Sequence, residues 1–552
     1  PFDQVARIEA QLMHWPGLEI VTRSKRYYPE GKEFAHILGY VAEANEQELA
    51  ADPYLALGDT VGKQGLEYVF EQRLRGHKGL YNVEVDVLGR SLGKTLVEEP
   101  QNGENLQLCL DTKLQKQLAA LLGDQTGSIV VMEPQTGRLL ALVTNPSYDN
   151  NVFVGGLSQK DWVALRDDPF HPLQNRAIQS VYPPGSVWKL MMAGLFLKEG
   201  ISPSFRVVCT GAVKLGNREF RCWRKGGHGA VDMIQSLLHS CDVYYYVLGE
   251  KLGIDRIESF AKACGFGAPT GIDLPHEKSG LVPSRAWKKR RSGEAWYRGE
   301  TLNVSIGQGY TLVTPLQMAN FVSSLLNGGK LMKPYVVSEM KDQDGNTVSK
   351  AEPTTIRQVI SEDTSKKVCQ MMQSVVDNGT GKNAYVAGYK VGGKTGTSTK
   401  LGESKEGEKN KYIVSFAAIA PADDPEIAMI IICDEPNVDL GGGAICAPVA
   451  ATVIKESMAV LGVEPSYTEE EKKTLSVKAP NVIAKSVSDA EAAIKSAGLD
   501  CKVVGTGDKI TSQSPAAGNT VPSGGQVVLY TSGAEKETVT VPDFTGLTVS
   551  QA

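Results

Sequence analysis

The sequence predicts an α+β protein built on an antiparallel sheet, because two pairs of apolar runs have the pattern of β-hairpins. The first pair, residues 128–133 and 138–145, flanks a turn at Pro134–Gly137. The second pair, Tyr412–Ala420 and Ile427–Cys433, brackets a proline-rich turn. The roughly 250 residues between the hairpins are largely helical in pattern. We therefore expect one antiparallel sheet with helices on both faces and a long helical insertion.

The length of 552 residues indicates several domains, since about 150 residues per domain is usual. The first part contains short strand-like runs, such as the alternating stretch Tyr81–Val87. A charged stretch near residue 470 has the composition of a linker. The motif around Pro480 recurs around Pro542, at a period of 62 residues. The expected units are a strand-rich N-terminal domain over 1–115, truncated at its start, a central domain over 116–462, a linker over 463–476, a small α+β module over 477–533, and the start of a second, truncated copy over 534–552.

Composition narrows the class of function. The chain is 41% hydrophobic and 22% charged, with a net charge of −5, so nothing favours binding to nucleic acid. No run approaches the roughly 18 consecutive apolar residues of a membrane span, and the first residues lack a signal peptide. The chain begins partway into a helix-like pattern, so we expect that an N-terminal membrane anchor precedes it in the full-length protein.

A serine and a lysine at helical spacing form a candidate nucleophile and base. Ser186 follows two prolines and a glycine and precedes an apolar run, which predicts that it lies at a helix N-terminus. Lys189 returns to the same face of the helix, so its amine can reach the Ser186 hydroxyl. Apolar neighbours such as Trp188 and Leu190 can favour the neutral amine that a general base requires. Taken alone, such a pair is more often a capping serine followed by a surface lysine.

Two further motifs make the assignment of Ser186 as a nucleophile more specific. Ser240-Cys241-Asp242 follows a helical stretch, and Lys394-Thr395-Gly396-Thr397 follows the strand-like run Tyr389–Val391. The order of the three motifs is the one used by penicillin-binding proteins and serine β-lactamases. The chain resembles class B penicillin-binding proteins over nearly its whole length, including Arg26–Pro29, Ala35–Tyr40 and Gly307-Gln308-Gly309.

The resemblance implies a peptidoglycan D,D-transpeptidase of the penicillin-binding transpeptidase fold. In this family Ser186 would attack the D-alanyl carbonyl of a stem peptide, Lys189 would take its proton, and D-alanine would leave after protonation through Ser240. Lys394 and Thr395 would hold the substrate carboxylate, and β-lactams would acylate the same serine. The remaining implied roles are close backbone approach at Gly396, and an oxyanion hole made by the N–H groups of Thr397 and Ser186.

One position and one regional pattern depart from the commonest family members. Asp242 stands where many relatives carry asparagine, which removes an amide donor and adds a carboxylate beside Lys189. In this the chain resembles the elongation-type penicillin-binding protein 2 group. Residues 1 to about 340 resemble that group, whereas residues 355–552 resemble sporulation-type relatives, so the sequence leaves a role in elongation or in sporulation open, and we favour elongation.

Three cysteines and a histidine form a candidate zinc set. Cys209, Cys222, His228 and Cys241 fall within 33 residues and supply the Cys₃His donors of a closed tetrahedral site. Some penicillin-binding protein 2 relatives look similar, with aspartates at the first two positions. A closed site implies structural zinc that fixes the Ser240–Asp242 loop and takes no part in the chemistry. The alternatives are buried free thiols or one disulfide.

The outer parts of the chain imply partners and a location. Residues 477–533 resemble a PASTA module, a type associated with cell-wall contact, and a folded spacer without a ligand is the alternative. The N-terminal domain resembles the pedestal that contacts a SEDS-family glycosyltransferase in the membrane. The expected partners are therefore peptidoglycan stem peptides, β-lactams and this polymerase, outside the cytoplasm in the periplasm or at the outer face of the membrane.

Three other functions are compatible with parts of this pattern. A serine β-lactamase shares the acylation step, but the pedestal and PASTA segments argue against it. A β-lactam or muropeptide sensor would need membrane spans and a cytoplasmic effector, and neither is visible. A pseudoenzyme that scaffolds a polymerase would not need all three intact motifs.

Overall fold

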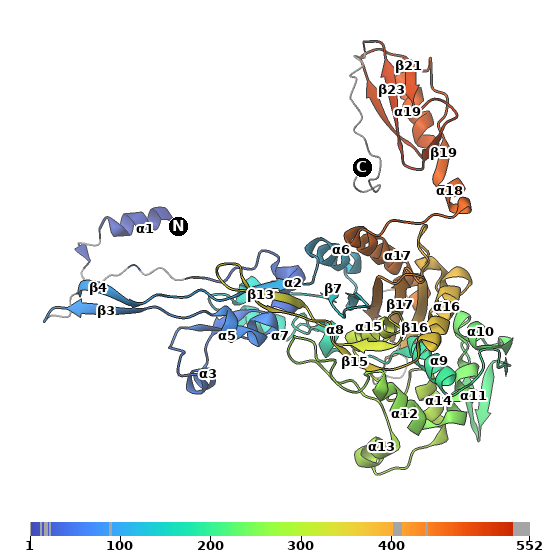
Figure 1. Ribbon diagram of the computed structural model, residues 1–552, viewed down its shortest axis with the longest axis horizontal. Helices are drawn as coiled ribbons and strands as arrows, with labels where there is room; N and C mark the ends of the chain where they lie inside the picture. Colours follow the sequence, from blue (N-terminus) through green and yellow to red (C-terminus); the bar gives the residue numbers. More distant parts are fainter. Residues whose placement is uncertain are drawn as a thin grey trace.

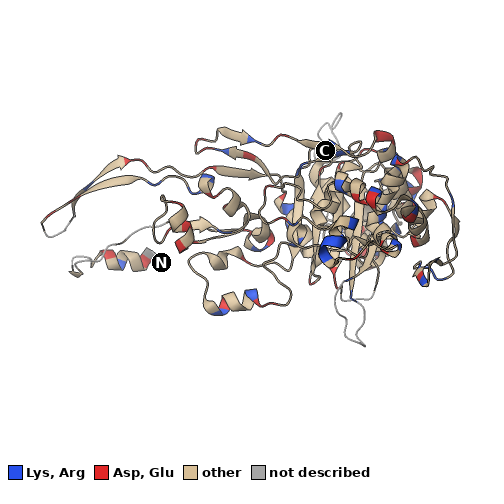
Figure 2. Ribbon diagram, turned by 90° about the horizontal axis from the view of Figure 1, so that it is seen from below, with Lys and Arg blue, Asp and Glu red and all other residues tan. Residues whose placement is uncertain are grey.

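The fold is that of a computed structural model of the chain, shown in Figure 1. It describes residues 2–11, 14–15, 20, 24–87, 91–400, 411–436 and 440–533. The expected second repeat over 534–552 therefore lies outside the described residues, as do residues 401–410 of the charged stretch before the second hairpin. An extended arm at one end of the molecule leads into a large body, and a small C-terminal module projects from that body (Figure 1). Basic and acidic side chains are interspersed along the molecule (Figure 2).

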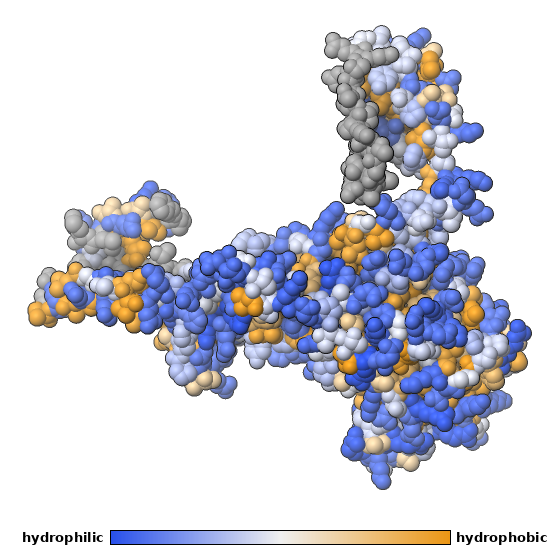
Figure 3. All heavy atoms as spheres, viewed as in Figure 1, coloured by the Kyte–Doolittle hydropathy of each residue, from blue (hydrophilic) through white to orange (hydrophobic). Residues whose placement is uncertain are grey.

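The N-terminal part combines strands with short helices. Its most exposed feature is the two-stranded antiparallel ribbon of β3 and β4, which forms the arm at the blue end of Figure 1. Every residue of β3 is exposed, including apolar side chains, and Figure 3 shows a hydrophobic surface over this arm. The elements are α1 (Phe2–Glu9), α2 (Gly31–Leu38), β1 (Val41–Glu43), α3 (Glu46–Ala51), β2 (Thr60–Gly62), α4 (Gly65–Val69), α5 (Glu71–Leu74), β3 (Leu80–Val85), β4 (Ser91–Glu98) and β5 (Asn105–Leu108).

A five-stranded antiparallel sheet is the centre of the body. Its spatial order is β16-β17-β18-β6-β7, which brings the two predicted hairpins together as neighbours and confirms the antiparallel sheet. The strands are β6 (Gly127–Met132), β7 (Leu139–Asn145), β16 (Gly392–Thr399), β17 (Tyr412–Ala420) and β18 (Ile427–Asp434). Alternate residues enter two cores: Val130 and Ile430 pack on one face, and Ile129 and Ile431 on the other. Because both faces are covered, the strands are continuous apolar runs.

The insertion between β7 and β16 covers one face of the sheet and is largely helical, as predicted. It also contains short antiparallel strand pairs that the helical pattern did not predict, the hairpin of β9 and β10 and the pair of β8 and β11 that brackets it. The helices are η2 (Asn150–Phe153), α7 (Gln159–Arg166), α8 (Arg176–Gln179), η3 (Gly185–Trp188), α9 (Lys189–Lys198), α10 (Met233–Leu238), α11 (Asp242–Leu252), α12 (Ile254–Ala263), α13 (Arg285–Ser292), α14 (Arg298–Ser305), α15 (Pro315–Ser324), α16 (Glu362–Asn378) and η4 (Lys382–Ala384). The strands are β8 (Val207–Cys209), β9 (Ala212–Leu215), β10 (Arg218–Arg221), β11 (Gly229–Val231), β12 (Lys330–Met332), β13 (Val337–Lys341), β14 (Thr347–Lys350) and β15 (Thr355–Gln358).

Helices α6 (Thr112–Leu122) and α17 (Gly442–Leu461) cover the other face of the sheet. Among the described residues, α17 is the one helix long and apolar enough to cross a membrane. Several of its apolar side chains, including Val453 and Ile454, are fully buried in the core shared with β17 and β18. In this structure α17 is therefore a core helix of the body.

The C-terminal module has its own small core, centred on Ile494, Val527 and Leu529. It contains β19 (Ser476–Lys478), α19 (Val487–Ser496), β20 (Asp500–Val504), β21 (Ile510–Ser514), β22 (Thr520–Pro522) and β23 (Gln526–Thr531). The predicted linker contains one helix, α18 (Glu469–Leu475), which begins with a capping box between Thr468 and Glu471. The linker is therefore partly ordered, and it separates the module from the body (Figure 1).

Candidate active site and metal cluster

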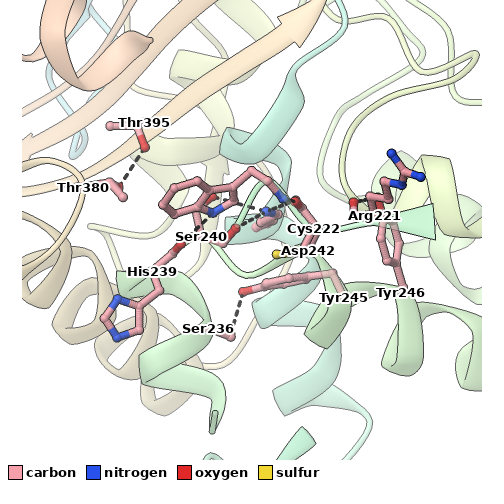
Figure 4. A network of polar contacts seen from close by, with 12 residues as sticks. Arg221, Cys222, Ser236, His239, Ser240, Asp242, Tyr245, Tyr246, Thr380 and Thr395 are labelled. Atoms are coloured by element: carbon pink, nitrogen blue, oxygen red, sulfur yellow. Dashed lines mark hydrogen bonds and ion pairs between the residues drawn. The ribbon is translucent and has the colours of Figure 1, made fainter. Parts of the chain in front are cut away.

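A cleft of about 820 Å³ lies at the edge of the sheet along β16. It brings together five of the predicted catalytic residues, Ser186, Ser240, Asp242, Thr395 and Thr397. The close-up in Figure 4 shows Ser240 between two groups, with Thr380 and Thr395 on one side and Arg221 and Tyr246 on the other. The other lining residues are Cys222, Trp223, Ile306, Gln308, Gly379, Lys382, Asn383, Ser398, Thr399, Tyr412, Gly441, Gly442, Gly443 and Ala444.

Ser186 lies in η3, a single 3₁₀ turn that runs directly into α9, as its predicted place at a helix N-terminus requires. Gly185 has φ 55°, a conformation that favours glycine, and its N–H donates to the Gly307 carbonyl at 2.9 Å. On the other side, the Ser398 hydroxyl donates to the Pro183 carbonyl at 2.8 Å. The turn that carries the serine is thus held between the Gly307 loop and β16.

Lys189 is fully buried beneath the cleft. Its Nζ donates to the Ser240 carbonyl at 3.0 Å, to Ser240 Oγ at 3.2 Å and to Asp242 Oδ1 at 2.7 Å. These contacts use all three donors of an ammonium. The apolar surroundings expected for Lys189 are present. The Asp242 carboxylate, however, gives the amine a compensating negative charge.

Lys394 is the second buried lysine of the site. Its Nζ donates to Ser240 Oγ at 3.0 Å and to the Thr395 carbonyl at 3.1 Å. Burial, and then the nearby charge of Lys189, hold the pKa of Lys394 well below its usual range. The Ser240 hydroxyl therefore connects two lysines, of which Lys394 is the one that burial favours as a neutral amine.

Ser240 has a left-handed backbone with φ 53°, which is rare for a residue other than glycine. Such strain costs about 1–3 kcal/mol and persists where surrounding contacts hold it. Here the side chain is held by Lys189 and Lys394. The strained backbone places the hydroxyl between the two amines.

The Lys394–Thr397 motif lies within β16, not after a strand at 389–391 as predicted. Two glycines, Gly392 and Gly393, start β16, and the strand pairs with β17 along its whole length. At Gly396 a Cβ atom would meet Val187 Cγ2 at 3.0 Å, so a side chain there would press against the serine turn. The Thr395 hydroxyl lies 2.9 Å from the Thr380 hydroxyl, at the wall of the cleft.

The four candidate metal ligands converge beside the cleft. One ligand atom from each of Cys209, Cys222, His228 and Cys241 lies within 4.8 Å of all the others. His228 Nδ1 is 3.7 Å from Cys209 Sγ and 3.5 Å from Cys222 Sγ. Ligands about 2.0–2.3 Å from a tetrahedral zinc are themselves about 3.5–3.8 Å apart, so the donor set fits this ion.

The protonation of the cluster also suits zinc. A hydrogen bond from the Cys241 thiol lowers the pKa of Cys222 to about 5, and the same contact raises the pKa of Cys241. The pair therefore contains one thiolate near neutral pH, and the thiolate is the form that binds metal. Cys241 lies between Ser240 and Asp242, so a metal at this cluster would hold the catalytic loop directly.

Several cleft residues were missed at the level of sequence. Trp223 is 62% exposed, and its indole N–H donates to the His239 carbonyl at 3.0 Å. Its backbone N–H donates to Asp242 Oδ2 at 3.1 Å, so the segment that carries Cys222 is joined to the Ser240–Asp242 segment. The run Gly441-Gly442-Gly443 before an apolar helix was a visible signal, since only glycines let α17 approach β16 this closely. Thr380 and Asn383 carried no such signal, whereas Gln308 lies in the Gly307-Gln308-Gly309 segment of the family resemblance.

Comparison with known families identifies the class of protein. The model of the penicillin-binding protein transpeptidase domain matches residues 127–455, more than half of the chain. The penicillin-binding protein dimerisation domain matches residues 1–108, and the PASTA domain matches residues 477–533. The chain belongs to the penicillin-binding protein transpeptidase family.

The relatives agree on this family. The chain is 37% identical to peptidoglycan D,D-transpeptidase MrdA of Acinetobacter baumannii over 80% of this chain and 67% of that protein. It is 33% identical to stage V sporulation protein D of Bacillus subtilis over 96% of this chain and 79% of that protein. Both groups that the sequence resembles are thus represented at similar identity.

Solved structures confirm the fold. The complex of PBP2 with MreC from Helicobacter pylori superposes with a TM-score of 0.73, at 30% identity over 84% of each chain. Pseudomonas aeruginosa PBP2 in complex with WCK 5153 gives 0.70, at 33% identity over 82% of this chain and 94% of that one. A peptidoglycan synthase complex of polymerization and crosslinking gives 0.70, at 29% identity over 84% of this chain and 81% of that one.

Proposed function

We propose that this peptidoglycan D,D-transpeptidase uses Ser186 as its nucleophile and the Lys189, Ser240 and Lys394 set as its proton-transfer machinery. The observation that carries the proposal is the Ser240 hydroxyl, which lies 3.2 Å from Lys189 Nζ and 3.0 Å from Lys394 Nζ at the floor of the cleft. A proton can move among these groups without leaving the site. As a member of its family, the enzyme acts on the cell wall outside the cytoplasm and is a target of β-lactams.

The chemistry follows in two steps. Ser186 Oγ forms a bond to the D-alanyl carbonyl carbon, its proton passes to the lysine pair, and the C–N bond to the terminal D-alanine breaks as that nitrogen gains a proton through Ser240. An acceptor amine then forms the new C–N bond, and the Ser186 C–O bond breaks as the hydroxyl regains its proton. We assign the substrate carboxylate to Lys394 and Thr395, and the oxyanion to the N–H groups of Ser186 and Thr397.

We also propose one structural zinc, held by Cys209, Cys222, His228 and Cys241. The convergence of the four donors and the thiolate at Cys222 support it. The ion would supply no chemistry, and its four protein ligands leave no position for water. Its effect would be to hold Cys241, and through it Ser240 and Asp242, beside Ser186.

The expected partner is a SEDS-family glycosyltransferase, and an N-terminal anchor would place the pedestal at the membrane. The exposed ribbon of β3 and β4 supports this, because apolar side chains such as Tyr81, Val83 and Leu92 face solvent there (Figure 3). The purified glycosyltransferase should bind the unmodified chain and should fail to bind the Tyr81→Glu/Val83→Glu variant. Equal association of the double variant would contradict this surface.

The test of the catalytic assignment is intact-mass spectrometry after incubation with a fluorescent penicillin. We expect one adduct that persists for hours and is absent from Ser186→Ala. Rapid turnover of the adduct would indicate a β-lactamase instead. A folded protein that forms no adduct would indicate a scaffold, and an adduct that remains in Ser186→Ala would refute the assignment of the nucleophile.

A further inference from the structure

The hairpin of β9 and β10 carries an unusual concentration of positive charge beside the cleft. Five cations and one acidic residue fall within residues 212–227 of a chain whose net charge is −5: Lys214, Arg218, Arg221, Arg224 and Lys225 against Glu219. All six side chains are exposed. A surface of one sign at the mouth of a cleft attracts ligands of the opposite charge.

The register of the hairpin decides which of these cations face the cleft. Lys214 pairs with Glu219, and Ala212 pairs with Arg221, so Lys214, Glu219 and Arg221 share one face of the ribbon. Arg221 is the hairpin cation that lines the cleft, and Lys214 lies on the same face of the ribbon. The opposite face carries Phe220, which is buried against Tyr246. Arg218 shares this face and lies 5.2 Å from the centroid of the Phe220 ring, so Lys214 and Arg221 are the cations of the other face.

The turn after β10 extends this surface with Arg224 and Lys225, which follow Trp223, an exposed residue that lines the cleft. Lys214, Arg224 and Lys225 make no ion pair within the described residues, and Arg221 pairs with Glu219 alone, with its side chain 80% exposed. We call Lys214, Arg221, Arg224 and Lys225 the cationic lobe. Its charges are available to a ligand because the protein hardly neutralises them.

We propose that the cationic lobe is the docking surface for the acceptor strand of peptidoglycan, whose stem-peptide carboxylates it binds. This rests on the proposed function, because it divides the cleft between two substrates. Figure 4 shows Thr380 and Thr395 on the opposite side of Ser240 from Arg221, so the donor carboxylate and the lobe occupy different ends of the site. A strand that carries an amine and carboxylates is recognised by a cationic surface next to the acyl-enzyme.

The test measures partition of the acyl-enzyme between water and an acceptor. The donor is a depsipeptide ester ending in D-Ala-D-lactate, and the acceptors are two stem tetrapeptides that differ only in whether the glutamate α-carboxylate is free or amidated. The unmodified protein should prefer the free acid at least fivefold at low salt, and the preference should shrink in 0.5 M NaCl because salt screens exposed charges. The salt series uses only the unmodified protein, so its result does not depend on whether a variant folds.

The variant is Lys214→Glu/Arg224→Glu/Lys225→Glu, whose positions flank the cleft residues Arg221 and Trp223. Its matched control is Lys289→Glu/Arg290→Glu/Arg291→Glu on α13, an exposed triple on a helix that contributes no residue to the cleft. The preference should vanish in the lobe variant and persist in the control. Equal preference in both variants, or no preference in the unmodified protein at low salt, overturns the proposal. If the lobe variant instead loses acylation by the depsipeptide donor and keeps the acceptor preference, the assignment of the lobe to the acceptor is overturned.

Acylation by fluorescent penicillin is followed in every sample, because it reports the donor half separately. We expect the ratio of transfer to acylation to fall at least fivefold in the lobe variant. A folded, unmodified protein that is never acylated would count against the proposed function, whereas normal acylation without any acid preference would count against the lobe alone.

Discussion

Lys189 Nζ lies 2.7 Å from Asp242 Oδ1, and the lysine side chain is fully buried. The other carboxylate oxygen accepts the backbone N–H of Trp223 at 3.1 Å. Asp242 therefore neutralises the buried amine and joins it to the loop that carries Cys222. The carboxylate that distinguishes this chain from relatives with asparagine has a structural task that an amide fulfils only in part.

Replacing Asp242 should destabilise the fold and slow acylation. Asp242→Ala leaves a buried ammonium without a counter-charge, and removal of one partner of such a pair costs about 3–5 kcal/mol. Asp242→Asn keeps the shape and one acceptor, so its loss should be smaller. Urea unfolding measures the first effect and the rate of penicillin acylation the second. Equal stability of Asp242→Ala and the unmodified protein would show that the ion pair contributes nothing.

The depressed pKa of Lys394 predicts a dependence of stability on pH. In the unfolded chain this lysine titrates near 10.4, and burial lowers its pKa in the folded state. Between the two values the unfolded chain binds more protons at this site, so the free energy of unfolding rises with pH, by at most about 1.4 kcal/mol per pH unit. Lys394→Met should remove that rise. We would compare urea unfolding of both proteins from pH 7 to 10, and a difference that stays flat or falls would contradict the prediction.

Removal of the proposed zinc should loosen the catalytic loop. Purified protein should contain about one zinc per chain, and Cys209→Ser should reduce that content, because a ligand is lost. Chelation should lower Tm and slow acylation of Ser186, since Cys241 lies between Ser240 and Asp242. Cys501→Ser, outside the cluster, is the control. Metal analysis that finds far less than one zinc, with Tm unaffected by chelation, would exclude the ion.

The glycine run at the start of α17 predicts a tightly packed wall of the cleft. A Cβ atom at Gly442 would meet the Gly396 carbonyl oxygen at 2.6 Å and the Ser415 carbonyl oxygen. Gly442→Ala should therefore push α17 from β16, with a loss of about 1–3 kcal/mol and slower acylation. At Gly93 a Cβ atom meets nothing within 4 Å, so Gly93→Ala is the matched control. Thermal unfolding of the two variants decides, and equal Tm values would argue against the packing constraint.

The sequence alone determined the sheet and the identity of most site residues. Strand periodicity and turn residues located both hairpins, since these signals are local and survive in any fold that buries both faces. The three motifs predicted Ser186, Ser240 and Lys394 as site residues, and the sequence also singled out the three cysteines and the histidine whose ligand atoms converge in the structure. In each case the type of side chain restricts which reaction or ligand is possible, and this information is present in the sequence before the fold is known.

Only the tertiary structure decided how these residues act on one another. The pairing of Lys189 with Asp242, the left-handed backbone of Ser240 and the second amine at Lys394 depend on contacts between residues 51 to 154 positions apart. No local pattern encodes the charge state of a buried lysine, because burial and the nearest counter-charge set it. The same holds for the cationic lobe, whose residues were visible in the sequence but whose place beside the cleft follows from the register of β9 and β10.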